Sequence, residues 1–131
     1  MAEQKKYKVL IVDDDEFLLN VYSVKFAKTG LEVATSAGAE EALRKLHEGF
    51  VPDAIVLDIV MPDMDGFELL EKFRAEGLAK GAVVIFLTNQ GQSSDIERAK
   101  KLGAQGYIVK ASTIPSEVLT EVMKHLEGTK K

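Results

Sequence analysis

Five short apolar runs alternate with segments of helical periodicity along this chain. A run of four to eight apolar residues bounded by turn residues indicates a buried strand, whereas apolar residues spaced three and four apart indicate an amphipathic helix. Strands that alternate with helices form a parallel sheet with helices on both faces. We therefore predict a five-stranded α/β fold with five helices, whose strands are residues 7–12, 31–35, 54–58, 82–87 and 105–109.

The polarity of the runs predicts the order of the strands in the sheet. The second run is short and carries polar residues, which is typical of an edge strand. The first, third and fourth runs are nearly all apolar, as expected for strands that are buried on both faces. This distribution favours the order 2-1-3-4-5, which is the flavodoxin-like, doubly wound arrangement.

Polar residues stand directly after four of the five runs. Ligands of doubly wound sheets bind outside the carboxyl ends of the strands, where the strand order reverses, here between the first and third strands. We therefore expect five side chains to meet at one edge of the sheet: Asp13, Asp14, Asp58, Thr88 and Lys110.

Three carboxylates that lie close together raise each other's pKa unless a cation lies among them. Oxygen ligands without a nearby histidine or cysteine favour Mg²⁺, and a lysine opposite them would hold an anion. This combination is typical of phosphoryl transfer, in which Asp58 could be the nucleophile that forms an aspartyl phosphate. Taken singly, each residue also has a structural explanation, such as helix capping by the acids at 13–16 or a turn at Thr88. Their joint occurrence at strand ends favours a site.

Composition narrows the class of protein. The chain has 131 residues, of which 46% are hydrophobic, so it suits one domain with a substantial core. We expect a single domain over residues 1–131, with its core at about 7–127 and polar tails. The absence of cysteine excludes disulfides and thiol chemistry, and no run reaches the roughly 18 apolar residues of a membrane span. A net charge of −4 argues weakly against a nucleic-acid-binding surface.

One calcium-binding pattern can be rejected. Residues 63–66 look like part of an EF-hand loop, with Gly66 as its invariant glycine. That alignment places Met61 at the first ligand position and Lys72 at the last, and neither can serve.

The sequence resembles the response-regulator receiver domain, the CheY-like family of two-component signalling. The resemblance extends from Lys8 to about Leu126 and depends on several motifs in combination. These motifs are Val12–Asp13–Asp14, Leu57–Asp58, Met61–Pro62, Asp65–Gly66, Leu87–Thr88, and Tyr107 three residues before Lys110.

The resemblance implies a phosphorylation site. Asp58 would accept a phosphoryl group from the phosphohistidine of a sensor histidine kinase or a phosphotransfer protein. Asp13, Asp14 and Asp58, with the backbone carbonyl of Val60, would hold Mg²⁺. Lys110 would pair with the phosphoryl group. The chain would be a cytoplasmic signalling phosphoacceptor that catalyses only its own phosphorylation and dephosphorylation.

The resemblance also implies a switch. Thr88 would move toward the phosphoryl group and Tyr107 would follow it, which would reshape the surface formed by the fourth helix, the fifth strand and the fifth helix. That surface would contact an unidentified downstream protein, and family members often dimerise through it. We expect the chain to act without an attached output domain and without direct contact to nucleic acid or membrane.

The chain departs from the family pattern beside the site. Ala111 follows Lys110 where the family commonly has proline, so we predict a trans Lys110–Ala111 bond, because a cis bond before alanine costs about 3 kcal/mol. Val60 and Gln90 offer no carboxylate to orient an attacking water, which predicts slow self-dephosphorylation.

Two other functions compete with this interpretation. A small Mg²⁺-dependent phosphohydrolase of the haloacid-dehalogenase type would use the D-x-D spacing of Asp13 and Asp15, but it would leave Asp58 without a role. A receiver-like module that is never phosphorylated would only bind partners, although all the expected site residues are present.

Overall fold

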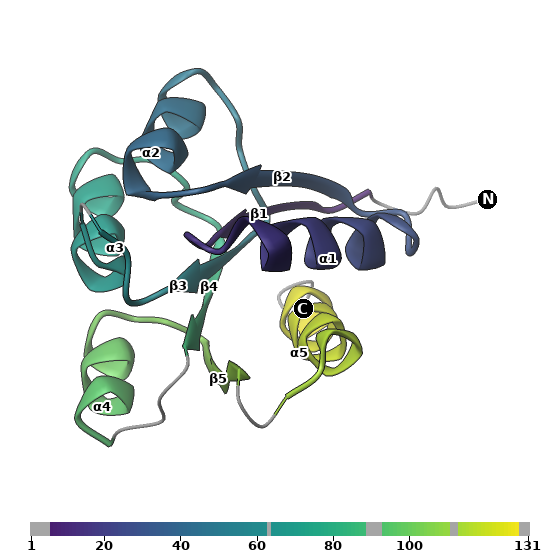
Figure 1. Ribbon diagram of the computed structural model, residues 1–131. Coiled ribbons are helices and arrows are strands. Elements are labelled where there is room, and N and C mark those ends of the chain that lie inside the picture. Colours follow the sequence, from purple (N-terminus) through teal and green to yellow (C-terminus); the bar gives the residue numbers. More distant parts are fainter. Residues whose placement is uncertain (1–5, 63, 89–92, 111–112, 129–131) are drawn as a thin grey trace.

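The structure is a computed structural model that describes residues 6–62, 64–88, 93–110 and 113–128. Strands and helices alternate along the chain, as the sequence predicts (Figure 1). Two predictions, the isomer of the Lys110–Ala111 bond and the contribution of Gln90, lie outside the described residues. The elements are β1 (Lys8–Val12), α1 (Glu16–Ala27), β2 (Glu32–Ser36), α2 (Ala39–His47), β3 (Ala54–Asp58), α3 (Gly66–Ala75), β4 (Val83–Thr88), α4 (Ser93–Lys101), β5 (Gly106–Val109) and α5 (Pro115–Gly128).

The five strands of the described chain form one parallel sheet in the order β2-β1-β3-β4-β5. The predicted order and fold class are therefore confirmed. The half-exposed β2 lies at an edge, whereas every residue of β3 and β4 is buried. Pro115 begins α5, where its missing N–H leaves no helical hydrogen bond unmade.

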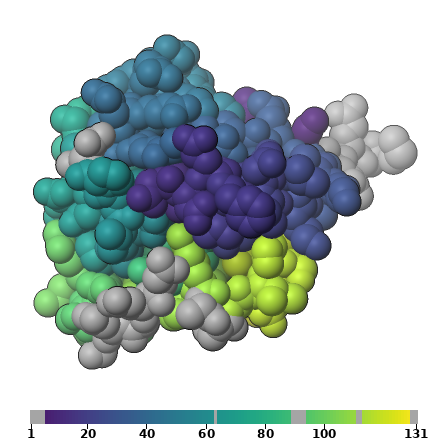
Figure 2. Space-filling view, viewed as in Figure 1, coloured from purple at the N-terminus to yellow at the C-terminus, as the bar shows by residue number. Residues whose placement is uncertain are grey.

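Helices cover both faces of the sheet. α1 and α5 pack on one face, and α2, α3 and α4 pack on the other (Figure 1). The space-filling view shows α1 directly beside α5 (Figure 2). Because successive side chains of a strand point to opposite faces, each strand contributes to two separate cores. Phe67 and Phe86 pack together in one core, with their ring centroids 4.9 Å apart, and Phe26 lies in the other.

Strand boundaries differ from the predicted ones by a single residue. β4 extends to Thr88, which pairs with Val109 of β5, and β2 extends to Ser36, which pairs with Val12. Backbone hydrogen bonding between strands does not depend on side-chain polarity, so these two strands continue one residue past their predicted ends. In the described parts of the chain, no helix combines the length and the apolar character that a membrane span requires.

The first helix buries a different set of residues from the one that helical spacing predicts. The spacing of Leu18, Val21, Tyr22 and Phe26 predicts one buried face. The structure buries Leu19 along with Tyr22 and Phe26, and leaves Leu18 and Val21 only half-buried. Leu18 still packs against this core from its half-buried position, so helical spacing predicts the buried face of α1 only in part. Apolar residues surround α1 on nearly all sides, so the periodicity alone does not define its buried face.

Candidate functional site

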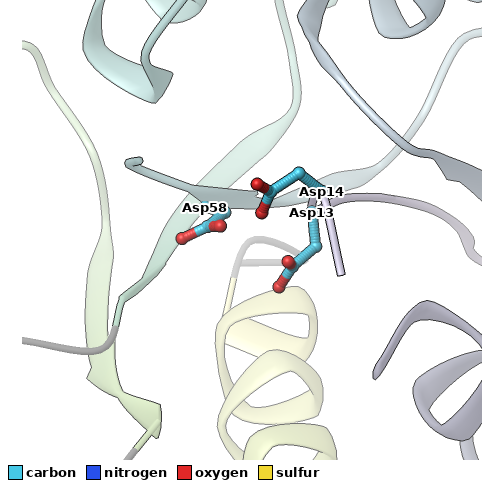
Figure 3. Close-up of side chains that lie close together, drawn as sticks. All are labelled: Asp13, Asp14 and Asp58. Atoms are coloured by element: carbon cyan, nitrogen blue, oxygen red, sulfur yellow. The ribbon is translucent and has the colours of Figure 1, made fainter. Parts of the chain in front are cut away.

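The three predicted carboxylates meet at the carboxyl end of the sheet. Asp13 and Asp14 directly follow β1, and Asp58 is the last residue of the neighbouring β3. One ligand oxygen from each residue lies within 4.8 Å of the other two. Figure 3 shows the three side chains projecting from these adjacent strand ends. Asp13 is fully buried and Asp58 is 5% exposed, whereas Asp14 is exposed to solvent.

Lys110 joins these carboxylates from the end of β5. Its Nζ lies 2.5 Å from Oδ2 of Asp13 and 3.6 Å from Oδ2 of Asp58. Its side chain is only 9% exposed, so both ion pairs are shielded from water. The sequence predicts that Lys110 faces the acids, but not that Asp13 is its closer partner.

Asp13 is held from three directions. Its backbone N–H donates to the carbonyl of Ser36 at 3.1 Å, and its Oδ1 accepts from the N–H of Asp15 at 2.9 Å. Its Oδ2 contacts Lys110. The role of Ser36 could not be predicted from the sequence, because Ser36 acts through its backbone carbonyl, which every residue type has.

The electrostatics of the site depend on burial. Burial raises the pKa of Asp58 from its ordinary value of 3.8 to about 7, and the charge of Asp13 adds to this effect against the opposing charge of Lys110. Burial by itself lowers the pKa of Lys110, but the hydrogen bond and charge of Asp13 outweigh it and raise that pKa. The site is therefore short of positive charge, although it contains a lysine.

Thr88 and Tyr107 lie on the two neighbouring strands β4 and β5. Thr88 ends β4 and is 3% exposed, while Tyr107 is half-buried in β5. Their hydroxyl groups are hydrogen-bonded to each other. Burial, with the negative charge of Asp95 on α4, raises the pKa of Tyr107. The hydroxyl contact thus connects the end of β4 to β5, and the charge of Asp95 on α4 acts on Tyr107.

The carboxylates line a hollow that is open to solvent. Its volume is about 320 Å³. Val60 stands at its rim with 74% of its surface exposed. The lining residues are Asp13, Asp14, Asp15, Leu18, Asp58, Val60 and Lys110.

Gly66 lets the start of α3 pack against the end of β3. Its N–H donates to the carbonyl of Ile59 at 2.7 Å. A Cβ at this position would lie 2.2 Å from the carbonyl oxygen of Asp58, which no side chain can tolerate. Asp65 and Glu68 form a capping box that fixes the first turn of α3. The Asp65–Gly66 motif is recognisable in the sequence, but the close approach of Gly66 to Asp58 is not.

The comparisons with known proteins agree with this geometry. The family model of the response regulator receiver domain matches residues 9–123. The chain is 34% identical to the chemotaxis protein CheY of Halobacterium salinarum, over 88% of this chain and 91% of that protein. It is 34% identical to the alkaline phosphatase synthesis transcriptional regulatory protein PhoP of Bacillus subtilis, over 88% of this chain and 46% of that protein.

Solved structures show the same fold. The crystal structure of a CheY-like response regulator receiver domain protein from Methanospirillum hungatei superposes with a TM-score of 0.85 at 30% identity, covering 96% of this chain and 98% of that one. The chain belongs to the response regulator receiver domain family of two-component systems. It spans about half the length of several curated relatives that it matches, among them the probable transcriptional regulator ycf27 of Guillardia theta.

The acidic group fits the Mg²⁺ that receiver domains bind. Its donors are all oxygen atoms, which suit a hard divalent cation. Three ionised carboxylates and one ammonium leave a charge of −2, which a divalent cation would balance. Burial is the main cause of the raised pKa of Asp58, and the charge of Asp13, which a cation would balance, adds to it.

Proposed function

We propose that Asp58 is a phosphoacceptor that receives a phosphoryl group from the phosphohistidine of a sensor histidine kinase or a phosphotransfer protein. The observation that carries the proposal is the position of Asp58, in an open hollow beside two further carboxylates and 3.6 Å from the ammonium of Lys110. A carboxylate oxygen of Asp58 attacks phosphorus, the P–N bond of a phosphohistidine protonated on its other ring nitrogen breaks, and the electron pair returns to the ring. The products are an aspartyl phosphate and a neutral histidine.

Asp13, Asp14 and Asp58, with the backbone carbonyl of Val60, would hold Mg²⁺. When bound, the ion supplies charge neutralisation for the transferring phosphoryl group. Lys110 can also bind the phosphoryl group from its present position. Its ammonium already contacts both buried carboxylates, so it can pair with phosphoryl oxygens on Asp58 while it stays close to Asp13.

Thr88 and Tyr107 would transmit the new charge to the surface. A phosphoryl group on Asp58 offers the hydroxyl of Thr88 stronger acceptors than the hydroxyl of Tyr107, which it now contacts. Movement of Thr88 would release Tyr107 and change the face formed by α4, β5 and α5. This is a two-state element biased by charge at one end. A downstream protein or a second copy of the chain would bind that face.

The phosphohydrolase alternative is not supported by the geometry of Asp15. One carboxylate oxygen of Asp15 accepts from the N–H groups of Phe17 and Leu18, which gives this residue a structural role at the start of α1. Asp15 is therefore the N-cap of α1. We propose one receiver domain over residues 1–131, acting in the cytoplasm and catalysing only its own phosphorylation and dephosphorylation.

Phosphorylation by a small phosphodonor tests the proposal. The protein is incubated with acetyl phosphate and Mg²⁺, and the intact mass is measured for wild type, Asp58→Asn and the control Asp15→Asn. We expect one phosphoryl group on wild type and on the control, and none on Asp58→Asn. Turnover of phosphate esters that requires Asp13 would establish the hydrolase instead. A protein that shows neither label nor turnover would be a binding module.

A further inference from the structure

A second cavity lies at the amino ends of the strands, whereas Asp58 lies at their carboxyl ends. Its volume is about 320 Å³, at the lower end of the roughly 300–1,000 Å³ of ligand pockets. It lies at the amino end of β4, between α3 and α4, which share one face of the sheet (Figure 1). The lining residues are Arg74, Leu78, Lys80, Gly81, Ala82, Val83, Gly103 and Gln105, with two cations and no carboxylate among them.

Arg74 is fixed in place with most of its donors unused. Its Nη1 donates to the carbonyl of Leu102 at 3.1 Å, at the end of α4. A Cβ at Gly103 would lie 3.0 Å from the same nitrogen, a tight contact that the arginine could relieve by a small shift. A guanidinium has five N–H groups, so about four remain for a ligand. Among the described residues, neither Arg74 nor Lys80 forms an ion pair with a carboxylate.

Gln105 adds a neutral donor. Its side-chain Oε1 accepts from the backbone N–H of Val84 at 2.8 Å. The backbone N–H of Gln105 donates to the carbonyl of Val84 at the same distance. Because the N–H of Val84 requires an acceptor, the orientation of the amide is defined. The NH₂ group of the exposed Gln105 side chain is left with two donors.

The acid at the end of α3 is already neutralised. Glu76 lies 2.6 Å from Nε2 of His47 and 3.2 Å from Nζ of Lys72. These contacts lower the pKa of Glu76, the hydrogen bond from His47 contributing most. Glu76 is therefore engaged elsewhere and does not compete for Arg74. In a chain with a net charge of −4, a cavity lined only by cationic and neutral groups is a local reversal of sign.

We propose that this cavity binds a small oxyanion of the phosphate class. A planar carboxylate is satisfied by one edge of a guanidinium, whereas a tetrahedral dianion can also accept from an ammonium and an amide on other sides. Arg74, Lys80 and Gln105 come from three separate segments of the chain and line one space. The helices α3 and α4 both end nearby, and their partial negative charge opposes the anion. We therefore expect a dissociation constant on the order of 1 mM.

The test is a titration followed by ¹H–¹⁵N NMR, without Mg²⁺ and at constant ionic strength. Inorganic phosphate and glycerol 3-phosphate are added in separate arms, and the amide signals of Gly81 and Gly103 are followed. Saturable shifts in both arms support the site. Saturable shifts in the glycerol 3-phosphate arm alone also support it and assign it to phosphomonoesters. Absence of saturable shifts in both arms at concentrations on the order of 10 mM would overturn it.

Matched variants distinguish specific binding in the cavity from nonspecific electrostatic attraction of the anion. We expect Arg74→Gln and Lys80→Gln each to weaken binding at least about fivefold, and Lys124→Gln to leave it unchanged. Lys124 lies on α5 outside the cavity and undergoes the same change of charge. Equal weakening by all three variants would contradict the proposal. Lys80 lies in an exposed loop, so its variant remains informative if Arg74→Gln does not fold. Asp58→Asn should bind phosphate as wild type does, so the result is independent of the proposed phosphorylation.

Discussion

The raised pKa of Asp58 predicts that the site destabilises the protein when Mg²⁺ is absent. Folding places this carboxylate in a buried position beside Asp13, and its pKa increases from 3.8 to about 7. The folded state therefore binds a proton more tightly than the unfolded state between these two values. The contribution of Asp58 to stability is therefore greatest below about pH 4 and decreases as the pH rises toward 7. Replacing Asp58 with asparagine removes the charge and keeps the shape.

The magnitude follows from the difference between the two pKa values. A difference of about 3 pKa units corresponds to about 4 kcal/mol, because each unit is worth about 1.4 kcal/mol. Asp58 lines a hollow that is open to solvent, so water and salt screen part of this energy. We expect Asp58→Asn to raise the free energy of unfolding by about 2 kcal/mol at pH 8. The gain should decrease by about half at pH 5.

Urea denaturation at pH 8 and pH 5, with a chelator and then with Mg²⁺, measures this effect. Mg²⁺ should stabilise wild type more than Asp58→Asn and so reduce the advantage of the variant. The control Asp15→Asn keeps the N-cap of α1 and should change little. An Asp58→Asn protein no more stable than wild type at pH 8, or one whose advantage does not depend on pH, would refute the reasoning.

Three further predictions concern the start of α3, the core and the lifetime of the phosphoryl group. Gly66→Ala should lower the free energy of unfolding by about 2–3 kcal/mol in urea denaturation, because its Cβ would meet the carbonyl of Asp58. The control Gly81→Ala, where nothing lies within 4 Å, should cost much less. Phe86→Ala should cost about 3–5 kcal/mol by the same method, because its fully buried ring leaves a cavity. The aspartyl phosphate should decay slowly, since the exposed Val60 offers no carboxylate to orient water. A half-life of seconds after removal of the phosphodonor would contradict this last expectation.

The order and type of the elements could be predicted because they depend on local patterns. Apolar runs and helical spacing alternate along the chain, and right-handed crossovers leave few ways to connect them. The exact strand ends could not be predicted. Thr88 and Ser36 are polar and look like turn residues, but each is paired with a residue of a neighbouring strand. The buried face of α1 was also ambiguous, because apolar residues occur on nearly all its sides.

The sequence by itself determined which side chains meet. Asp13, Asp14, Asp58 and Lys110 follow or end parallel strands, and they line one hollow because the carboxyl ends of such strands share one edge of the sheet. Their gathering is therefore a consequence of topology, which short-range patterns encode.

Only the tertiary structure decided how these residues interact. It placed the ammonium of Lys110 closer to Asp13 than to Asp58, and it raised the pKa of Asp58 by burial. It also brought Gly66 against the carbonyl of Asp58. These interatomic distances are set by the packing of segments that are far apart in sequence. The energies of desolvation and of charge–charge interaction depend steeply on such distances. The pattern of residues along the chain specifies neither these distances nor these energies.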